Sequence, residues 1–227
     1  MKKIVVSLMV IFVLVVGCGE SKVQEEQKVE KENKPMNKKV HAKYRAVVYK
    51  TKDLQEYASV LAKGEAVTLL DEVKNTFNKK ELTVAKIKQA DDSIAYVLRK
   101  HLGGEPVVFI ENDVEVKIKP TETADTHVRV DKGTVGFIDD TKDNWIKVYI
   151  GKVNYNGKDR WVTGHWVKSG YSKKADIVKD ALIYEKSVNK LEENPEDQAA
   201  LDNLKSLVNK DSMLSDMAAE KHLELSE

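Results

Sequence analysis

The sequence predicts a mainly β protein that ends in a helical segment. From Lys43 onward, short runs in which apolar and polar residues alternate are typical of β-strands. This β region also reads as two similar halves, residues 43–104 and 105–170. Beyond Gly170 the apolar residues recur at helical spacing, at Ile177, Ala181, Tyr184, Val188 and Leu191. These three observations predict two small β domains followed by a helical segment in residues 171–227.

The first residues have the composition of a secretion signal. Met1-Lys2-Lys3 is a positively charged start, and residues 4–16 form an apolar run that only Ser7 interrupts. A helix that spans a hydrocarbon core of about 30 Å needs roughly 20 apolar residues, so this run is too short for that purpose and has the length of a signal peptide. We expect residues 1–17 to be a signal peptide.

The expected signal ends at Cys18, the only cysteine among the 227 residues. The sequence Val15-Val16-Gly17-Cys18 resembles the lipobox of bacterial lipoproteins. That resemblance implies that the Cys18 thiol is coupled to diacylglycerol, that cleavage makes Cys18 the first residue, and that its new amine is then acylated, for example with palmitate. Two or more acyl chains hold a protein stably on a membrane. The alternative interpretation is an N-terminal anchor helix with an incidental cysteine.

The segment that follows, residues 18–42, is rich in lysine and glutamate and poor in large apolar side chains. Such a segment buries too little surface to offset the entropy lost on ordering, so we expect a disordered tether. The whole chain has 38 basic and 37 acidic residues, which are mixed along its length. This balance offers no basic stripe that would follow a phosphate backbone, and we expect no nucleic-acid partner.

The two β halves share a weak internal repeat. Gly103-Gly104 marks their boundary, either as a hinge or as a tight turn. Four pairs of segments align: Val47-Val48-Tyr49 with Val107-Val108-Phe109, Lys63-Gly64 with Lys132-Gly133, Ala85-Lys86-Ile87 with Lys147-Val148-Tyr149, and residues 96–102 with 161–167. A domain of about sixty residues is marginally stable alone, so we expect the halves to share an interface.

The second half resembles the bacterial SH3 (SH3b) family. The resemblance rests on Asn144-Trp145-Ile146-Lys147-Val148, on "GKDRWVTGHWVK" at residues 157–168, and on a Lys-Gly pair ahead of an apolar strand. It implies that residues 43–104 and 105–170 each fold as an SH3-like five-stranded β-barrel. Thr163 stands where peptide-binding SH3 domains carry a proline, so the resemblance does not extend to polyproline recognition.

All three tryptophans lie in the second half. The family pattern implies that Trp161 is a core residue, whereas Trp145 and Trp166 flank a ligand groove with Tyr149 and Phe109 nearby. These four, Trp145, Trp166, Tyr149 and Phe109, are the candidate ligand-binding residues. Large aromatic side chains in a shallow groove suit a peptide or a sugar–peptide ligand. The alternative is that Trp145 and Trp166 only cover a small core.

The C-terminal segment, residues 171–227, is expected to contain a helical hairpin or three helices. Asn194 is expected to cap the second helix, with Pro195 at its first position. Residues 181–204 resemble one junction of a tetratricopeptide repeat. Three interpretations remain open at this point: a hairpin packed on the second β half, a helix pair that binds a partner, and a repeat scaffold.

The sequence contains no recognised catalytic motif. Its five histidines lack the spacing of metal ligands, and no Gly-x-Ser-x-Gly, phosphate-loop or dinucleotide-binding pattern occurs. If Cys18 carries lipid, no thiol remains for a zinc site or a cysteine nucleophile. We therefore expect a protein that is not an enzyme and that needs neither a metal nor a cofactor.

Together these observations predict a membrane-anchored envelope lipoprotein that binds without catalysis. The expected ligand of the SH3b-like domains is cell-wall peptidoglycan or an envelope protein or peptide, while the acylated Cys18 contacts membrane lipid. The alternative is a structural or scaffold lipoprotein whose C-terminal helices recruit a partner protein. Gly19 follows the cysteine, where the inner-membrane retention signal of enterobacteria has Asp. We expect the outer membrane or the outer leaflet of the cytoplasmic membrane.

Overall fold

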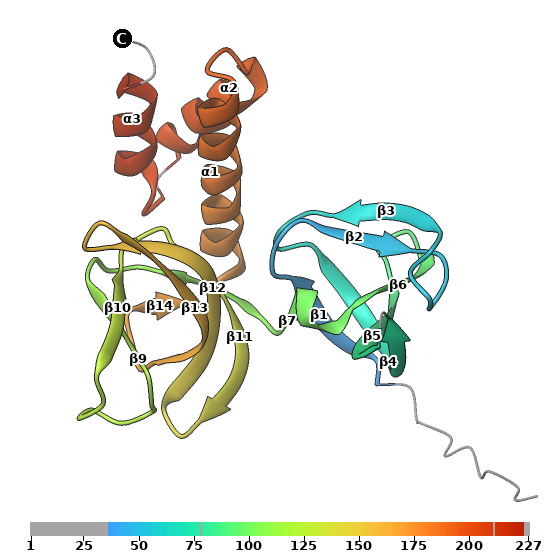
Figure 1. Cartoon of the computed structure of the whole chain (residues 1–227). Coiled ribbons are helices and arrows are strands. Elements are labelled where there is room, and N and C mark those ends of the chain that lie inside the picture. The colour runs from blue at the N-terminus through green and yellow to red at the C-terminus, as the bar shows by residue number, and fades with distance from the viewer. Residues whose placement is uncertain (1–35, 78, 211, 225–227) are drawn as a thin grey trace, which may run out of the picture. The chain divides into compact units, whose positions relative to one another are not determined.

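The computed structural model describes residues 36–77, 79–210 and 212–224. Within these ranges the chain forms two antiparallel seven-stranded sheets, each of which curls on itself, followed by three α-helices (Figure 1). The predicted class, mainly β with C-terminal helices, is confirmed. The expected signal peptide, the expected acylation at Cys18 and the expected tether up to residue 35 lie outside the described residues.

The first sheet comprises residues 38–103. Its elements are β1 (Lys38–Ala42), β2 (Ala46–Tyr49), β3 (Tyr57–Leu61), β4 (Ala66–Phe77), β5 (Lys80–Lys88), β6 (Ile94–Leu98), the 3₁₀ turn η1 (Arg99–His101) and β7 (Leu102–Gly103). The strands lie in the order β3-β2-β6-β5-β4-β1-β7. Alternate residues point inward, as the pleat of a strand requires, and Val48, Leu69, Ile87 and Val97 fill the core.

Strand β1 begins inside the segment that the sequence predicts to be a tether. In "KKVHA" the apolar residues Val40 and Ala42 alternate with polar ones, and both are buried in the first core. The two lysines that precede Val40 raise the average charge of the segment, and a strand of only five residues is not recognised against that composition. The expectation of a tether up to residue 42 is therefore wrong for residues 38–42.

The second sheet comprises residues 106–172. Its strands are β8 (Pro106–Phe109), β9 (Val114–Lys117), β10 (Thr126–Val130), β11 (Val135–Lys142), β12 (Trp145–Tyr155), β13 (Lys158–Val167) and β14 (Tyr171–Ser172). They lie in the order β10-β9-β13-β12-β11-β8-β14, so every strand has a counterpart at the same place in the first sheet. Within the described residues, each half thus has seven strands where the sequence predicts five.

The matching strand orders correct the alignment of the two halves. Strand β2 is the counterpart of β9, whereas the sequence aligns Val47-Val48-Tyr49 with residues of β8. The error arises because β2 and β8 contain similar apolar triplets, whereas β9 has the sequence VEVK. Both sheets also have a bulge at the same point, between Leu69 and Asp71 in β4 and between Ile138 and Asp140 in β11. This bulge makes Lys86 the counterpart of Lys147, one residue away from the sequence alignment.

The helices are α1 (Ala175–Glu193), α2 (Gln198–Val208) and α3 (Ser215–Glu224). Helix α1 packs on the second sheet, where Val178 and Ala181 share a core with Val108 and Phe137. A second apolar cluster joins α1 to α2 and α3. Among the helices of the described residues, none has the length and apolar composition needed to cross a membrane.

The cap of α2 differs from the predicted one. Asp197 is the N-cap, and its carboxylate accepts a hydrogen bond from the Ala200 backbone N–H at 2.9 Å. Asn194 instead ends α1, where its backbone N–H donates to the Lys190 carbonyl. Lys190 also pairs with Asp197 at 3.2 Å, which favours Asp197 as the cap over Asn194.

The aligned Lys-Gly pairs are real counterparts, and each lies against the helical segment. Gly64 precedes β4 with φ +81°, and Gly133 precedes β11 with φ +86°. Leu182 of α1 packs directly over Gly64, while Met217 of α3 packs over Gly133. The neighbouring Lys63 binds Glu185 of α1 through two hydrogen bonds of 2.5 and 2.7 Å. The helices therefore contact the same turn in both halves.

Candidate functional site

The candidate ligand-binding residues lie in different environments. Phe109 is fully buried, and Trp145 is 6% exposed. Phe109 belongs to the core of the second sheet, and both side chains offer little surface to a ligand. Trp161, which the sequence assigns to the core, is 61% exposed, so that assignment is wrong. Trp166 and Tyr149 are partly exposed.

The outward orientation of Trp161 follows from the pleat of β13. Its neighbour Val162 points into the core and is fully buried, so Trp161 must point outward. Trp161 and Trp166 are five residues apart, a spacing that would place them on opposite faces of a regular strand. Gly164, with φ +78°, is an extra residue between the pairs Val148–His165 and Tyr149–Thr163. This bulge places both indoles on the outward side of β13, which we call the tryptophan face.

Trp166 lies at the centre of a row of outward residues across four strands. The register pairs Lys117 of β9 with Trp166, Trp166 with Lys147 of β12, and Lys147 with Asp140 of β11. The Lys147 ammonium lies 5.7 Å from the centre of the Trp166 ring, within range of a cation–π interaction. The row thus offers an aromatic surface flanked by charged groups.

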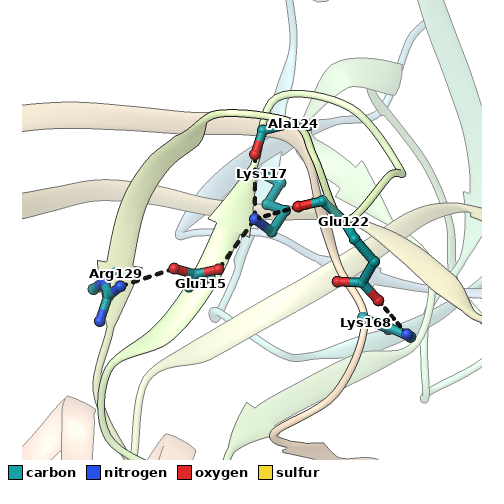
Figure 2. Close-up of polar contacts among 6 residues, drawn as sticks. All are labelled: Glu115, Lys117, Glu122, Ala124, Arg129 and Lys168. Atoms are coloured by element: carbon teal, nitrogen blue, oxygen red, sulfur yellow. Dashed lines mark hydrogen bonds and ion pairs between the residues drawn. The ribbon is translucent and has the colours of Figure 1, made fainter.

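The loop between β9 and β10 is held in place by the buried ammonium of Lys117 (Figure 2). Lys117 is 9% exposed and donates hydrogen bonds to the carbonyls of Glu122 and Ala124, both at 3.2 Å. It also pairs with Glu115 at 3.1 Å, and hydrogen bonding to Lys117 lowers the pKa of Glu115. Arg129 binds the other carboxylate oxygen of Glu115. A charged side chain thus fixes a loop whose strand adjoins Trp166.

Glu122 extends this network toward the end of β13. Its carboxylate pairs with Lys168, the residue that follows β13, while its backbone carbonyl accepts from Lys117 (Figure 2). One residue therefore joins the loop to β13 and to β9. These two contacts fix the loop between β9 and β10 next to the tryptophan face, so the loop borders this surface in a defined position.

Two histidines stack beside Trp161. The rings of His127 and His165 lie 4.0 Å apart and within 9° of parallel, and His127 Nε2 lies 3.1 Å from the Trp161 carbonyl oxygen. His165 lies in β13, and among the described residues its buried Nδ1 has no hydrogen-bond partner. Burial, and to a smaller extent the neighbouring His127, lower the pKa of His165.

Tyr149 lies where the two halves meet rather than on the tryptophan face. The Lys43 ammonium, from the first half, is 4.8 Å from the Tyr149 ring centre and 2.7 Å from Asp139. The Tyr44 ring lies 6.0 Å from that of Tyr149. Burial and the charge of Asp139 raise the pKa of Tyr149. These contacts provide an interface between the halves of the kind expected from their small size.

Gly104 is part of the same interface. Its backbone N–H donates to the Ile138 carbonyl at 2.8 Å, and a Cβ at Gly104 would lie 2.5 Å from that oxygen. Of the two roles open to Gly103-Gly104, a hinge or a tight turn, these close contacts disfavour the hinge.

The first sheet carries a row that corresponds to the one around Trp166. Tyr49 pairs with Tyr96, Tyr96 with Lys86, and Lys86 with Asp71. An aromatic residue, a lysine and an aspartate therefore recur in the same order in both sheets. Sequence comparison misses this correspondence because it aligns Tyr96 with Trp161 instead of Trp166. The two residues that follow bulges, Asp71 and Asp140, are the signal that could have revealed it.

Residues that could hold a metal do not gather at this surface. Within residues 36–77, 79–210 and 212–224, no three His, Cys, Asp or Glu side chains cluster as metal ligands do. The surface instead presents aromatic faces with flanking ammonium groups. Such a surface binds the apolar faces of sugars or peptides and the carboxylates attached to them.

Two solved structures that resemble this chain are distant from it in sequence. NlpC2 and NlpC1 from Trichomonas vaginalis each match at 14% identity and a TM-score of 0.23 over 70% of this chain. The chain spans 57% and 52% of the length of those two proteins, respectively. No curated protein matches the sequence.

The sequence also matches one family profile. That profile describes lipoprotein LenA, and the match extends over residues 4–226, which is nearly the whole chain. The chain therefore belongs to the lipoprotein LenA family.

Proposed function

We propose that this protein is a lipid-anchored envelope protein, acylated at Cys18, whose folded part is a non-catalytic binding module. Membership in a lipoprotein family indicates a membrane-anchored place in the cell envelope. The sequence around Cys18 supports a lipobox, and two or more acyl chains at that residue would anchor the chain stably. The membrane is the outer membrane or the outer leaflet of the cytoplasmic membrane.

The two sheets belong, in this proposal, to SH3-like β-barrels of the bacterial type. The identical strand order of the halves supports a duplicated small domain. The Lys-Gly turns, which place a glycine at positive φ ahead of β4 and β11, support the same assignment.

The tryptophan face is the ligand-binding surface, and its ligand is the sugar–peptide polymer of the cell wall. The observation that carries this proposal is the 61% exposure of Trp161 on the same side of β13 as Trp166. An exposed indole is costly in water and stacks well on the apolar face of a sugar ring. Lys147 beside Trp166 supplies a charge for carboxylates of the peptide portion.

The packing of the helices favours this proposal over a scaffold role for the C-terminal segment. Val178, Ala181 and Leu214 are buried against the second sheet, and Leu191 and Leu204 are buried between the helices. Their apolar faces are thus engaged within the chain. A partner helix would have to displace these contacts.

Sedimentation with purified peptidoglycan tests the ligand. Trp161→Ala and Trp166→Ala in the full-length chain should each weaken binding by about thirtyfold, which corresponds to about 2 kcal/mol for a central aromatic contact. Leu223→Ala is the matched control, because Leu223 is 66% exposed on α3. Unchanged sedimentation of both tryptophan variants would remove the tryptophan face as the site. If the wild type, but neither tryptophan variant, retains an envelope protein and does not sediment with peptidoglycan, the ligand is a protein and not the polymer.

The lipid anchor has a separate test. Cys18→Ser should leave the precursor at its unprocessed size and prevent incorporation of labelled palmitate. A Cys18→Ser chain that is processed and labelled like the wild type would show that another residue anchors the protein.

A further inference from the structure

A basic groove lies between helix α1 and the first sheet, and it shares no lining residue with the tryptophan face. Its volume is about 1200 Å³. One wall is the α1 surface from Ala175 to Glu193, a stretch of about 27 Å at 1.5 Å per residue. The other wall comes from β1, β3 and the Lys63-Gly64 turn. The groove is therefore long enough for several units of an extended polymer.

The contacts between its walls give the groove a defined shape. Lys63 binds Glu185, and Leu182 lies over Gly64, so α1 is held against the first sheet at the turn before β4. All of these residues belong to the same compact unit. An ion pair and an apolar contact therefore hold the two walls of the groove in fixed positions.

The charge of the lining is strongly positive. Seven lysine or arginine residues line the groove against three glutamates, although the chain as a whole has a net charge of only +1. Glu185 and Glu105 are already paired with Lys63 and Lys173. Four exposed cations have no carboxylate within ion-pair distance among the residues that the structure describes: Lys39, Arg45, Lys179 and Lys186.

We propose that this groove is a second binding site, specific for an anionic polysaccharide. The free cations of both walls face the same channel, which complements a chain that carries regularly spaced sulfate groups. The lining contains no Phe, Tyr or Trp, so it lacks the stacking platforms that single-stranded nucleic acids use. Six of its seven cations are lysines, which bind anions as point charges, whereas arginine suits the planar carboxylates of an acidic protein.

The site does not depend on the proposed function of the tryptophan face. Neutral sugar rings are expected on Trp161 and Trp166, whereas the groove recognises charge. A protein anchored in the envelope with both sites would hold a wall polymer with one surface and a polyanion with the other.

Binding of the full-length chain to heparin, as a model anionic polysaccharide, tests the proposal. Lys179→Gln combined with Lys186→Gln should weaken heparin binding by at least about tenfold, because two of the four free cations are removed and fewer counterions are released on binding. The slope of log affinity against log salt should also become shallower. Lys142→Gln combined with Lys158→Gln is the matched control, since both residues are exposed and the change in net charge is the same.

Each outcome decides the matter. A loss confined to the groove variant, with uncharged dextran not bound by the wild type, supports the site. An equal loss in the control variant would show that net charge alone drives binding and would overturn the proposal. Polyglutamate binding as tightly as heparin would assign the groove to acidic proteins instead. Trp161→Ala should leave heparin binding unchanged, so failure of either site is recognised separately.

Discussion

The contact between Gly64 and Leu182 gives the sharpest prediction about stability, because it fixes α1 on the first sheet. Gly64→Ala would place a Cβ 2.4 Å from Leu182 Cδ1, at a residue with φ +81°. The positive φ costs about 1–2 kcal/mol for a residue with a Cβ. Overpacking against Leu182 adds about 1–3 kcal/mol. We expect the free energy of unfolding to fall by about 2–5 kcal/mol.

Two further variants separate the two causes. Gly157→Ala introduces a Cβ at φ +71° with nothing within 4 Å, so it should cost only the backbone part, about 1–2 kcal/mol. In a Leu182→Ala background the overlap disappears, and Gly64→Ala should then cost about as much as Gly157→Ala. The double-mutant cycle should show a coupling of about 1–3 kcal/mol.

The assay is urea unfolding of each variant, followed by circular dichroism. The free energies are compared at constant m-value, since a changed m would indicate a different unfolded or partly folded state. If Gly64→Ala costs no more than Gly157→Ala, or if the cycle is additive, Leu182 does not lie over Gly64 in solution. The basic groove would then lose one of its two wall contacts.

Three other predictions concern the second sheet and the helices. Deletion of residues 175–227 exposes Val108, Val135 and Phe137, and the burial of each such side chain contributes about 1.5–3 kcal/mol to stability. The truncated chain should therefore aggregate. A soluble, cooperatively folded product would contradict the packing of α1 on the second sheet. Lys117→Met removes the buried ammonium, so it should lower the free energy of unfolding by about 1–3 kcal/mol and speed proteolysis within residues 118–125. Lys168→Met removes only an exposed ion pair and should change the free energy of unfolding by less than about 1 kcal/mol. Burial lowers the pKa of His41, His101 and His165 below their ordinary value of 6.5, so the unfolded chain takes up protons at a higher pH than the folded chain does. The free energy of unfolding should therefore fall as the pH drops from 6.5 toward the lowered pKa values. Urea titrations at several pH values measure this dependence, and His165→Gln should make it weaker.

The local sequence pattern was sufficient to predict the types of secondary structure and several of the turns that connect them. The alternation of apolar residues predicts strands such as "EAVTLLDE", and helical spacing predicts α1, because both patterns express one buried face per element. The Lys-Gly pairs are correctly aligned, since glycine is the residue that suits the positive φ of both turns. The short strand β1, which begins with two lysines, was not predicted by the same reasoning because charged residues dominate its surroundings.

The candidate site was predicted only in part, for a reason that lies in the bulges. A single inserted residue changes which side of a strand every later residue faces, and neither Gly164 nor the residue between Leu69 and Asp71 is marked as a bulge by its neighbours. Trp161 was therefore assigned to the wrong side of the second sheet, while Trp166 keeps a place on the tryptophan face.

What the sequence by itself determined is the order of elements: a lipoprotein-like start, two β halves and a helical end, because each follows from residues close together in the chain. What only the tertiary structure decided is which side chains share a surface. The free cations of the basic groove come from positions 39 to 186, and the row around Trp166 comes from four strands. Such groupings depend on strand register and on where a helix packs, and no local pattern records either.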